Sequence, residues 1–286
     1  MHKLRVRLLA LDLDGTLLEA GSTLSAANRE AVARAQAMGL QVVLVTGRSW
    51  RSTHTYYEAL GLTGPAICYL GALVVADGSG RIAHYRPLVQ PAWEQLRDFA
   101  LANGLAVTAA VGVDQAVADG DLPGRGLVAA DIACATRKAD DFSDWEGWNP
   151  YTEIHSDLSP CKAPPVMVAV YGDQSVRSVL AEFSAGLPQS QFDLTDRIAG
   201  ETVLHVWHAQ VDKGRALADF CRARGIRPGE VAAIGDAPMD ISMIKYAGLG
   251  VAVPNGHPAL KAAAGLIATP SEAIDLILKE GRTCAD

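Results

Sequence analysis

The sequence predicts an α/β protein with a mostly parallel β-sheet and an inserted α+β module. Several apolar, β-branched runs have the length of buried strands, each run ends in a polar cluster, and helical stretches lie between them. Strands that alternate with helices are typical of βαβ units, whose neighbouring strands run parallel. The runs and the residues that end them are 8–11 before Asp12, 42–45 before Thr46, 231–234 before Gly235 and 249–253 before Pro254.

The predicted helices carry boundary signals at both ends. A side-chain oxygen at the N-cap accepts a hydrogen bond from a free backbone N–H, and glycine adopts the left-handed conformation that commonly ends a helix. The helices and their boundary residues are 25–38 with Ser25 and Gly39, 212–224 with Asp212 and Gly225, and 271–279 with Ser271 and Gly281.

The middle of the chain follows a different pattern, because helical stretches lie among short strand candidates and a break at 162–165. The helical stretches are 90–103 and 174–185, and the strand candidates are 105–108, 115–118 and 166–170. We therefore expect a separate inserted domain. The predicted boundaries are 1–85 for the first part of the core, 86–204 for the insert and 205–286 for the second part of the core.

Composition excludes several classes of protein. The chain has 286 residues, 49% hydrophobic and 20% charged, which is typical of an ordinary folded protein. A net charge of −7 argues against a nucleic-acid-binding protein. The 5 scattered cysteines include no Cys-x-x-Cys pair, so we expect neither a disulfide framework nor a zinc site. No apolar stretch is long enough to span a bilayer and no signal peptide is apparent, so we expect a soluble, cytoplasmic protein without a membrane partner.

The segment Asp12-Leu13-Asp14-Gly15-Thr16 is the most informative motif, because it places two carboxylates two residues apart at the end of a buried strand. Positions i and i+2 of a strand point the same way, and two anions directed at one place repel each other unless a cation or a proton intervenes. Mg²⁺ is the metal that best fits oxygen ligands of this kind. A β-turn that contains acidic residues is the alternative interpretation.

Ligands of parallel sheets bind beyond the carboxyl ends of the strands, so the polar clusters are expected to share one pocket. This convergence supports a functional site more strongly than any single motif. The residues that it would bring together are Asp12, Asp14, Thr46, Arg48, Asp236 and Asn255.

Lys213 and Thr46-Gly47-Arg48 are suited to binding an anion. Lys213 lies in the first turn of its helix, where the macrodipole disfavours a cation unless an anion is near. A hydroxyl, an unobstructed backbone N–H and a guanidinium at a strand end suit phosphate oxygens. Taken alone, a solvated lysine and an ordinary polar turn would be the favoured explanations of these residues.

Asp236 and Asp240 supply two further carboxylates after a predicted strand. Helix capping would explain Asp236 alone, but not Asp240 on the short apolar helix that follows. His205 and His208 could form a metal pair, although a half-buried strand is favoured. The aromatic residues of 144–151 could stack on a ligand, although packing is favoured.

Together and in this order, these motifs resemble the haloacid dehalogenase superfamily, and the long insert resembles the cap of its Cof-like phosphatase branch. The resemblance covers the whole chain and is specific in the sheet domain. It implies a Rossmann-like parallel sheet core with an inserted α+β cap domain. It also implies transfer of a phosphoryl group, in which positioning and charge neutralisation supply most of the catalysis.

The resemblance implies a role for each matching residue. Asp12 would be the nucleophile that forms an aspartyl-phosphate, Asp14 the general acid and base, and Thr46 and Lys213 the groups that hold the phosphoryl. Mg²⁺ would be bound by the Asp12 side chain, the Asp14 carbonyl and Asp236, with Asp240 behind them. The expected substrate-binding residues are Gly15, Thr16, Gly47, Arg48 and Asn255.

Two positions depart from the pattern of the superfamily, which usually has Asn where this chain has Leu70 and Met239. Both amides normally lie near the phosphate or the metal, and the loss of such an outer contact often costs about 10–100-fold in metal affinity or activity. We therefore expect a working site with altered metal binding or substrate orientation.

The resulting hypothesis is a Mg²⁺-dependent phosphatase for small phosphorylated metabolites, with sugar phosphates favoured, acting as a monomer or homodimer. A phosphomutase or phosphotransferase is one alternative, and a non-catalytic sugar-phosphate-binding protein is another. The insert is expected to set specificity, for which the candidates are Arg125, Trp145, Trp148 and Lys162.

Overall fold

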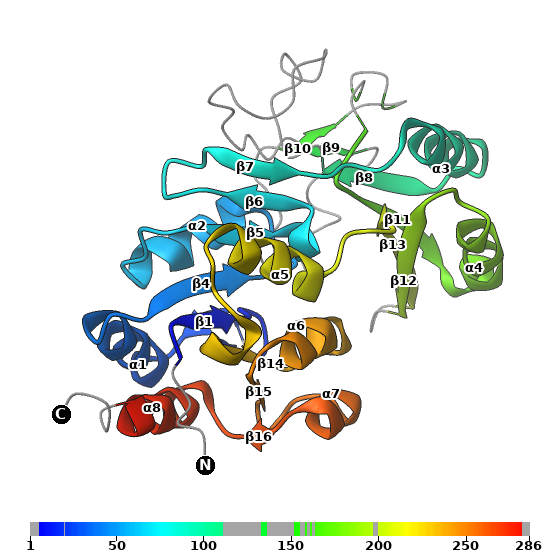
Figure 1. The fold of residues 1–286 in the computed structure, drawn as a ribbon. Helices are drawn as coiled ribbons and strands as arrows, with labels where there is room; N and C mark the ends of the chain where they lie inside the picture. Colours follow the sequence, from blue (N-terminus) through cyan, green and yellow to red (C-terminus); the bar gives the residue numbers. More distant parts are fainter. Residues whose placement is uncertain are drawn as a thin grey trace. The chain divides into compact units, whose positions relative to one another are not determined.

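The computed structural model describes residues 6–19, 21–110, 133–135, 152–154, 158, 161, 164–196 and 200–281. The chain forms two compact units (Figure 1). The first contains residues 1–48, 53–79 and 212–286, and the second contains 49–52 and 80–211.

The first unit is built on a sheet in which β1 (Leu8–Leu11) lies between β14 (Val231–Gly235) and β4 (Gln41–Val45), parallel to both. This arrangement confirms the predicted α/β class with a mostly parallel sheet. The strand order within the unit is β16-β15-β14-β1-β4-β5-β6, and only β5 and β6 pair antiparallel among these described strands. The remaining bounds are β15 (Leu249–Ala252), β16 (Leu266–Ile267), β5 (Ala66–Cys68), β6 (Leu73–Val75) and the small hairpin β2 (Leu18–Glu19) and β3 (Thr23–Leu24).

The helices of this unit occupy the stretches between the parallel strands. The Ser25 hydroxyl accepts a hydrogen bond from the Asn28 N–H at 3.3 Å, and the Asp212 carboxylate accepts one from the Arg215 N–H at 2.8 Å, so both predicted N-caps are confirmed. The helices are α1 (Ala26–Ala37), α2 (Trp50–Ala59), α5 (Lys213–Ala223), α6 (Ile241–Tyr246), α7 (Pro258–Ala263) and α8 (Pro270–Gly281).

The predicted start of the last helix was wrong by two residues. Helix α8 begins at Pro270, and Thr269 rather than Ser271 is its cap. The Thr269 hydroxyl accepts from the Glu272 N–H at 3.4 Å, and the Glu272 carboxylate accepts from the Thr269 N–H at 2.9 Å. This reciprocal capping box favours a helix that starts at Pro270. Proline also suits the first helical position, because it has no N–H that would need a partner.

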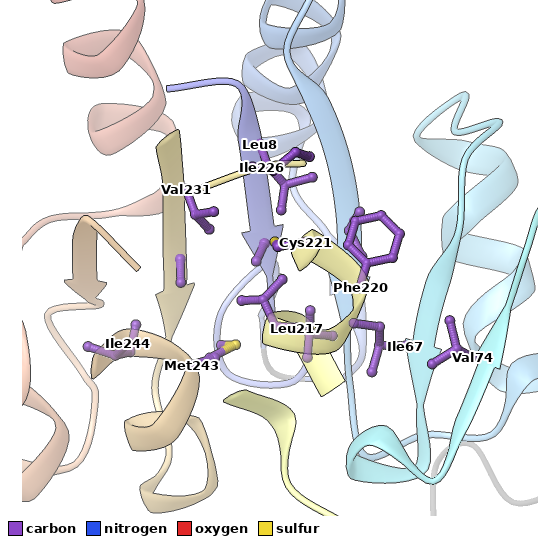
Figure 2. Packing of buried hydrophobic residues seen from close by; sticks show 14 of the residues in the cluster. Leu8, Ile67, Val74, Leu217, Phe220, Cys221, Ile226, Val231, Met243 and Ile244 are labelled. Carbon is purple, nitrogen blue, oxygen red and sulfur yellow. The ribbon is translucent and has the colours of Figure 1, made fainter. Parts of the chain in front are cut away.

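The main hydrophobic core lies between the sheet and helices α5 and α6 (Figure 2). Leu217 and Phe220 of α5 and Met243 of α6 pack on strand residues that include Leu8 and Ile67. Burying each such side chain fully contributes about 1.5–3 kcal/mol. This packing fixes the first turn of α5, which carries Lys213, relative to the ends of the strands.

The second unit is an α+β domain with a mostly antiparallel sheet in the order β10-β9-β8-β11-β13-β12. The predicted strands at 105–108 and 166–170 correspond to β8 and β11, whereas 115–118 lies outside the described residues. The bounds are β7 (Ile82–Tyr85), α3 (Gln90–Ala102), β8 (Ala106–Ala110), β9 (Ala133–Ala135), β10 (Thr152–Ile154), β11 (Met167–Asp173), α4 (Arg177–Ala185), β12 (Ser190–Asp196) and β13 (Glu201–His208).

Strand β13 determines where the second unit ends. It crosses the boundary predicted between 204 and 205, pairs with β11 and β12, and belongs to the second unit, which runs to Val211. His205 and His208 therefore lie in a paired strand, which is the interpretation that the sequence favoured over a pair of metal ligands. The His208 Nδ1 atom accepts a hydrogen bond from the Gln210 N–H at 3.0 Å.

Cys161 is disulfide-bonded, although no disulfide framework was expected, whereas Cys68 and Cys221 are buried and form no disulfide. The sequence reasoning considered only the number and spacing of cysteines, which do not report how the chain folds back on itself. Among the described residues, no helix combines the length and apolar character needed to cross a membrane. The aromatic segment 144–151 and the specificity candidates Arg125, Trp145, Trp148 and Lys162 lie outside the described residues.

Candidate active site

The candidate site is built at the carboxyl ends of β1, β4 and β14. Leu11 is in register with both Ile234 and Leu44, and the Asp12 N–H continues the ladder to the Ile234 carbonyl at 3.0 Å. The residues that follow these strands are therefore neighbours although they are far apart in the sequence.

A buried ammonium joins two of the predicted carboxylates. The Nζ atom of Lys213 lies 2.7 Å from Oδ1 of Asp12 and 2.6 Å from Oδ1 of Asp240. The side chains are 4%, 6% and 0% exposed, in the order Lys213, Asp12 and Asp240. Removing one partner of such a buried network leaves an uncompensated charge, so the three groups form one electrostatic unit.

Helix α5 can place Lys213 there because it approaches α6 very closely. A Cβ atom on Gly214 would stand 2.4 Å from the backbone carbon of Ser242, so only glycine fits this position. The Gly214 N–H also donates to the Ser242 hydroxyl at 3.0 Å. The contact brings the first turn of α5, with its lysine, to the end of β14.

Asp240 has both of its oxygens occupied. Its Oδ2 atom accepts hydrogen bonds from the N–H groups of Asp236 at 3.1 Å and Ala237 at 3.0 Å, while Oδ1 faces Lys213. Asp240 therefore shapes the turn after β14 and holds the lysine, which agrees with a place behind the metal ligands. Both oxygens of Asp240 thus already have partners within the protein.

Asp236 approaches the first motif closely enough to require a glycine there. Gly15 has φ +71°, and a Cβ atom on it would stand 2.3 Å from Oδ2 of Asp236. The Thr16 hydroxyl donates to Oδ1 of Asp236 at 3.2 Å. Gly15 and Thr16 thus contact Asp236, and the substrate contact expected of them stays a prediction.

The charges of the site are unbalanced without a further cation. Burial and then the Asp240 charge raise the pKa of Asp12 well above its usual value, against the opposing effect of Lys213. Burial and Asp240 also raise the pKa of Asp236, against lowering by Asp12 and Thr16. Burial alone would lower the pKa of Lys213, but Asp12 and Asp240 raise it. One ammonium thus binds two carboxylates, and a third carboxylate lies close enough to feel its charge.

The donor set fits a hard divalent cation. Asp12, Asp236 and Asp240 each offer a carboxylate oxygen, and these atoms lie within 4.8 Å of one another. Oxygen donors of this kind are those that Mg²⁺ prefers. Since the oxygens of Asp240 are occupied, Asp12 and Asp236 are the side chains that would hold the ion. A cation there would also remove the excess negative charge.

Thr46 and Gly47 follow β4 beside the site, and Thr46 contacts Leu70, whose backbone is strained. Thr46 is fully buried, and its hydroxyl accepts a hydrogen bond from the Arg48 N–H at 3.1 Å. Leu70, one of the two departures from the resembled pattern, has φ 59° and donates its N–H to the Thr46 carbonyl at 3.0 Å. Leucine rarely adopts this left-handed conformation, which asparagine accepts more readily.

The structure also shows a pair that the sequence reasoning missed. Arg48, expected to contact substrate, is directed at Asp14 and donates from Nε to Oδ2 of Asp14 at 2.8 Å. Asn255 lies nearby, and its Nδ2 group is 3.4 Å from the Gly15 carbonyl. Asp14 and Arg48 each lie three residues after the end of a strand, and these two strands are parallel neighbours. This equal spacing was a weak signal in the sequence that the two side chains could pair.

An α/β fold with an acidic site at the carboxyl ends of its parallel strands is the class of protein that the motifs predict, and comparison with known sequences identifies the family. A sequence model of the haloacid dehalogenase-like hydrolases matches residues 9–279, so the chain belongs to this family. It is therefore a hydrolase of the superfamily that its motifs resemble.

Two curated relatives that match nearly the whole chain are named phosphatases. The chain is 29% identical to the pyridoxal phosphate phosphatase YbhA of Escherichia coli, over 91% of this chain and 92% of that protein. It is 27% identical to the 5-amino-6-(5-phospho-D-ribitylamino)uracil phosphatase YwtE of Bacillus subtilis, over 90% of each. These relatives are consistent with a phosphoric monoester hydrolase.

Solved structures show the same fold. A haloacid dehalogenase-like hydrolase from Bacteroides thetaiotaomicron superposes with a TM-score of 0.75 at 25% identity, covering 96% of this chain and 99% of that chain. A HAD/COF-like hydrolase from Plasmodium vivax gives a TM-score of 0.75 at 18% identity, covering 98% and 96%. The second likeness supports the Cof-like fold alone.

Proposed function

We propose that the protein is a Mg²⁺-dependent phosphatase that hydrolyses small phosphorylated metabolites through an aspartyl-phosphate on Asp12. The observation that carries this proposal is the buried cluster of Lys213, Asp12 and Asp240 with Asp236 beside it. A nucleophilic carboxylate can approach a phosphate dianion only where positive charge offsets the repulsion. Sugar phosphates stay the favoured substrates, and the second unit is proposed to be the cap that selects among them.

The residues divide the reaction into two displacements. In the first, an Asp12 oxygen bonds to phosphorus while the bond from phosphorus to the ester oxygen breaks, and Asp14 gives that oxygen a proton. In the second, water attacks phosphorus, Asp14 takes the proton, and the bond to Asp12 breaks. Lys213 and Thr46 hold the phosphoryl oxygens throughout. Mg²⁺ held by Asp12, Asp236 and the Asp14 carbonyl would neutralise phosphate charge.

A panel of phosphorylated metabolites tests the proposal directly. Purified protein is assayed for phosphate release with Mg²⁺ and again after chelation, in water enriched in ¹⁸O. We expect release that depends on Mg²⁺ and incorporates one solvent oxygen. Transfer of phosphate to a sugar hydroxyl without solvent oxygen would favour the phosphotransferase, and binding without any turnover would favour the non-catalytic protein.

Metal binding should be visible as added stability. An ion that binds only the folded state stabilises it by about 2.7 kcal/mol at 100 times its Kd, so Mg²⁺ should raise the thermal unfolding midpoint. In Asp236→Asn this response should disappear, and Asp219→Asn, on an exposed pair with Arg222, should keep it. An equal Mg²⁺ response in Asp236→Asn and the wild type would contradict the proposed ligand set.

The same variant should be more stable than the wild type when no metal is present. The pKa of Asp236 is raised by folding, so its ionised form opposes folding once the pH exceeds the usual value for aspartate, about 3.9. Asparagine removes this penalty at neutral pH and leaves stability below that pH nearly unchanged. Scanning calorimetry in chelator at two pH values measures both effects.

Met239 gives a smaller prediction. This residue is 37% exposed and precedes Asp240 in the turn after β14, where related proteins usually have asparagine. Met239→Asn should restore a polar outer contact and shift the Mg²⁺ activation curve to lower concentration, by as much as about 10-fold. An unchanged activation curve would show that this position does not influence the ion.

A further inference from the structure

The side chain of Asp14 is held by a two-pronged contact. Nε of Arg48 donates to Oδ2 of Asp14 at 2.8 Å, and Nη2 donates to Oδ1. A bidentate guanidinium–carboxylate pair fixes the plane of the carboxyl group as well as its distance. The Asp14 side chain is nevertheless 56% exposed, so the contact orients a carboxylate that solvent and small molecules can reach.

Arg48 is itself fixed by residues outside the catalytic motifs. Its Nη2 also donates to the Ser22 hydroxyl at 2.9 Å, and its guanidinium carbon lies 5.2 Å from the centre of the Tyr56 ring. The Tyr56 hydroxyl in turn donates to the Ser22 carbonyl at 2.9 Å. The Arg48 side chain is only 11% exposed, so Ser22 and Tyr56 hold the arginine in addition to Asp14.

This geometry disfavours a direct role for the Nε and Nη2 groups of Arg48 in binding the substrate. The hydrogens of Nε and Nη2 are engaged by Asp14 and Ser22, so a substrate would have to break a charged bidentate pair to use them. Hydrogen bonds between charged groups are stronger than neutral ones, and a small ligand would have to replace them.

We propose that Arg48 is a positioning residue, held by Ser22 and Tyr56, that acts through Asp14 rather than on the substrate. The inference rests on the proposed phosphatase activity, in which Asp14 delivers a proton to the leaving oxygen and removes one from water. A carboxyl group held in one orientation is already aligned for both transfers. Losing Arg48 should therefore lower kcat and leave KM nearly unchanged.

A double-mutant cycle separates the two roles. Arg48→Gln and Arg48→Lys are compared with the wild type, alone and combined with Asp14→Asn, at saturating Mg²⁺. The substrates are phenyl phosphate, whose leaving group needs protonation, and 4-nitrophenyl phosphate, whose leaving group needs much less. Arg34→Gln, which breaks an exposed 2.8 Å pair with Asp275, is the matched control. Thermal unfolding verifies that each variant folds.

We expect Arg48→Gln to reduce kcat by about 10–100-fold on phenyl phosphate and by less on 4-nitrophenyl phosphate, with KM within about 2-fold. Arg48→Lys should recover only part of this, since lysine cannot bind both oxygens in one plane. In the Asp14→Asn background, Arg48→Gln should add no further loss.

Two results would overturn the inference about Arg48 and leave the proposed function intact. One is a full additional loss from Arg48→Gln in the Asp14→Asn background, and the other is a raised KM with unchanged kcat on both substrates, which is the signature of a substrate ligand. A wild-type protein that hydrolyses neither substrate, nor any ester of the metabolite panel, would instead overturn the proposed function and this inference with it.

Discussion

Asp12→Asn should abolish turnover, with a loss of kcat on the order of 10⁴-fold or more, because an amide cannot form the acyl-phosphate. The fold should survive the change, since burial and Asp240 raise the pKa of Asp12 and its negative charge opposes folding. The measurement is phosphate release from 4-nitrophenyl phosphate, together with denaturation of the wild type and the variant under the same conditions.

Asp219→Asn is a suitable control for this experiment, because Asp219 lies on α5, pairs with Arg222 and has a largely exposed side chain. It should retain full activity. Trapping of the phosphorylated protein by rapid acid quench adds an independent readout. Protein-bound phosphate should be present in the control and absent from Asp12→Asn. Retained turnover in Asp12→Asn would show that another group is the nucleophile.

Lys213→Met should have the largest effect on stability. The side chain is buried between Asp12 and Asp240, and removing one partner of a buried charge network costs about 3–5 kcal/mol because the remaining charges lose their compensation. Urea or guanidinium denaturation in the presence of chelator measures this loss. Activity should be lost as well, since no ammonium remains to offset the charge of the nucleophile and the phosphate.

A second substitution tests the cause of that loss. In Lys213→Met combined with Asp240→Asn, one of the two orphaned carboxylates is neutralised, so part of the lost stability should return while activity stays absent. Mg²⁺ should also stabilise Lys213→Met more than it stabilises the wild type, because the ion replaces missing positive charge. Equal stability of Lys213→Met and the wild type would show that the buried cluster is not an electrostatic unit.

The parallel sheet and the meeting of Asp12, Asp236, Asp240 and Lys213 could be predicted because they depend on strong local signals. Apolar runs define the strands, and the ends of parallel strands necessarily share one edge. The meeting of Asp12 and Asp236 follows from that topology, whereas Lys213 and Asp240 were placed at the site by the resemblance to the superfamily. Their catalytic and metal-binding roles stay predictions, which the experiments above test.

The features that sequence reasoning missed depend on contacts between segments. The pair between Arg48 and Asp14 requires Ser22 and Tyr56 to hold the guanidinium, and no spacing rule connects these positions. The close approach of Gly15 to Asp236 likewise appears only once two strand ends are placed together. The substrate contacts expected of Gly15, Thr16 and Arg48 stay predictions, and the structure adds contacts of these residues with Asp236 and Asp14.

Strand order has a consequence for synthesis of this chain. β1 lies between β4 and β14, and β14 begins at Val231, after the entire second unit. A nascent chain that ends before β14 leaves one edge of β1, with its four apolar residues, without its native neighbour. Ribosome-bound intermediates of about 220 residues should therefore be the species most dependent on chaperones, and truncation at the end of the second unit should give insoluble protein.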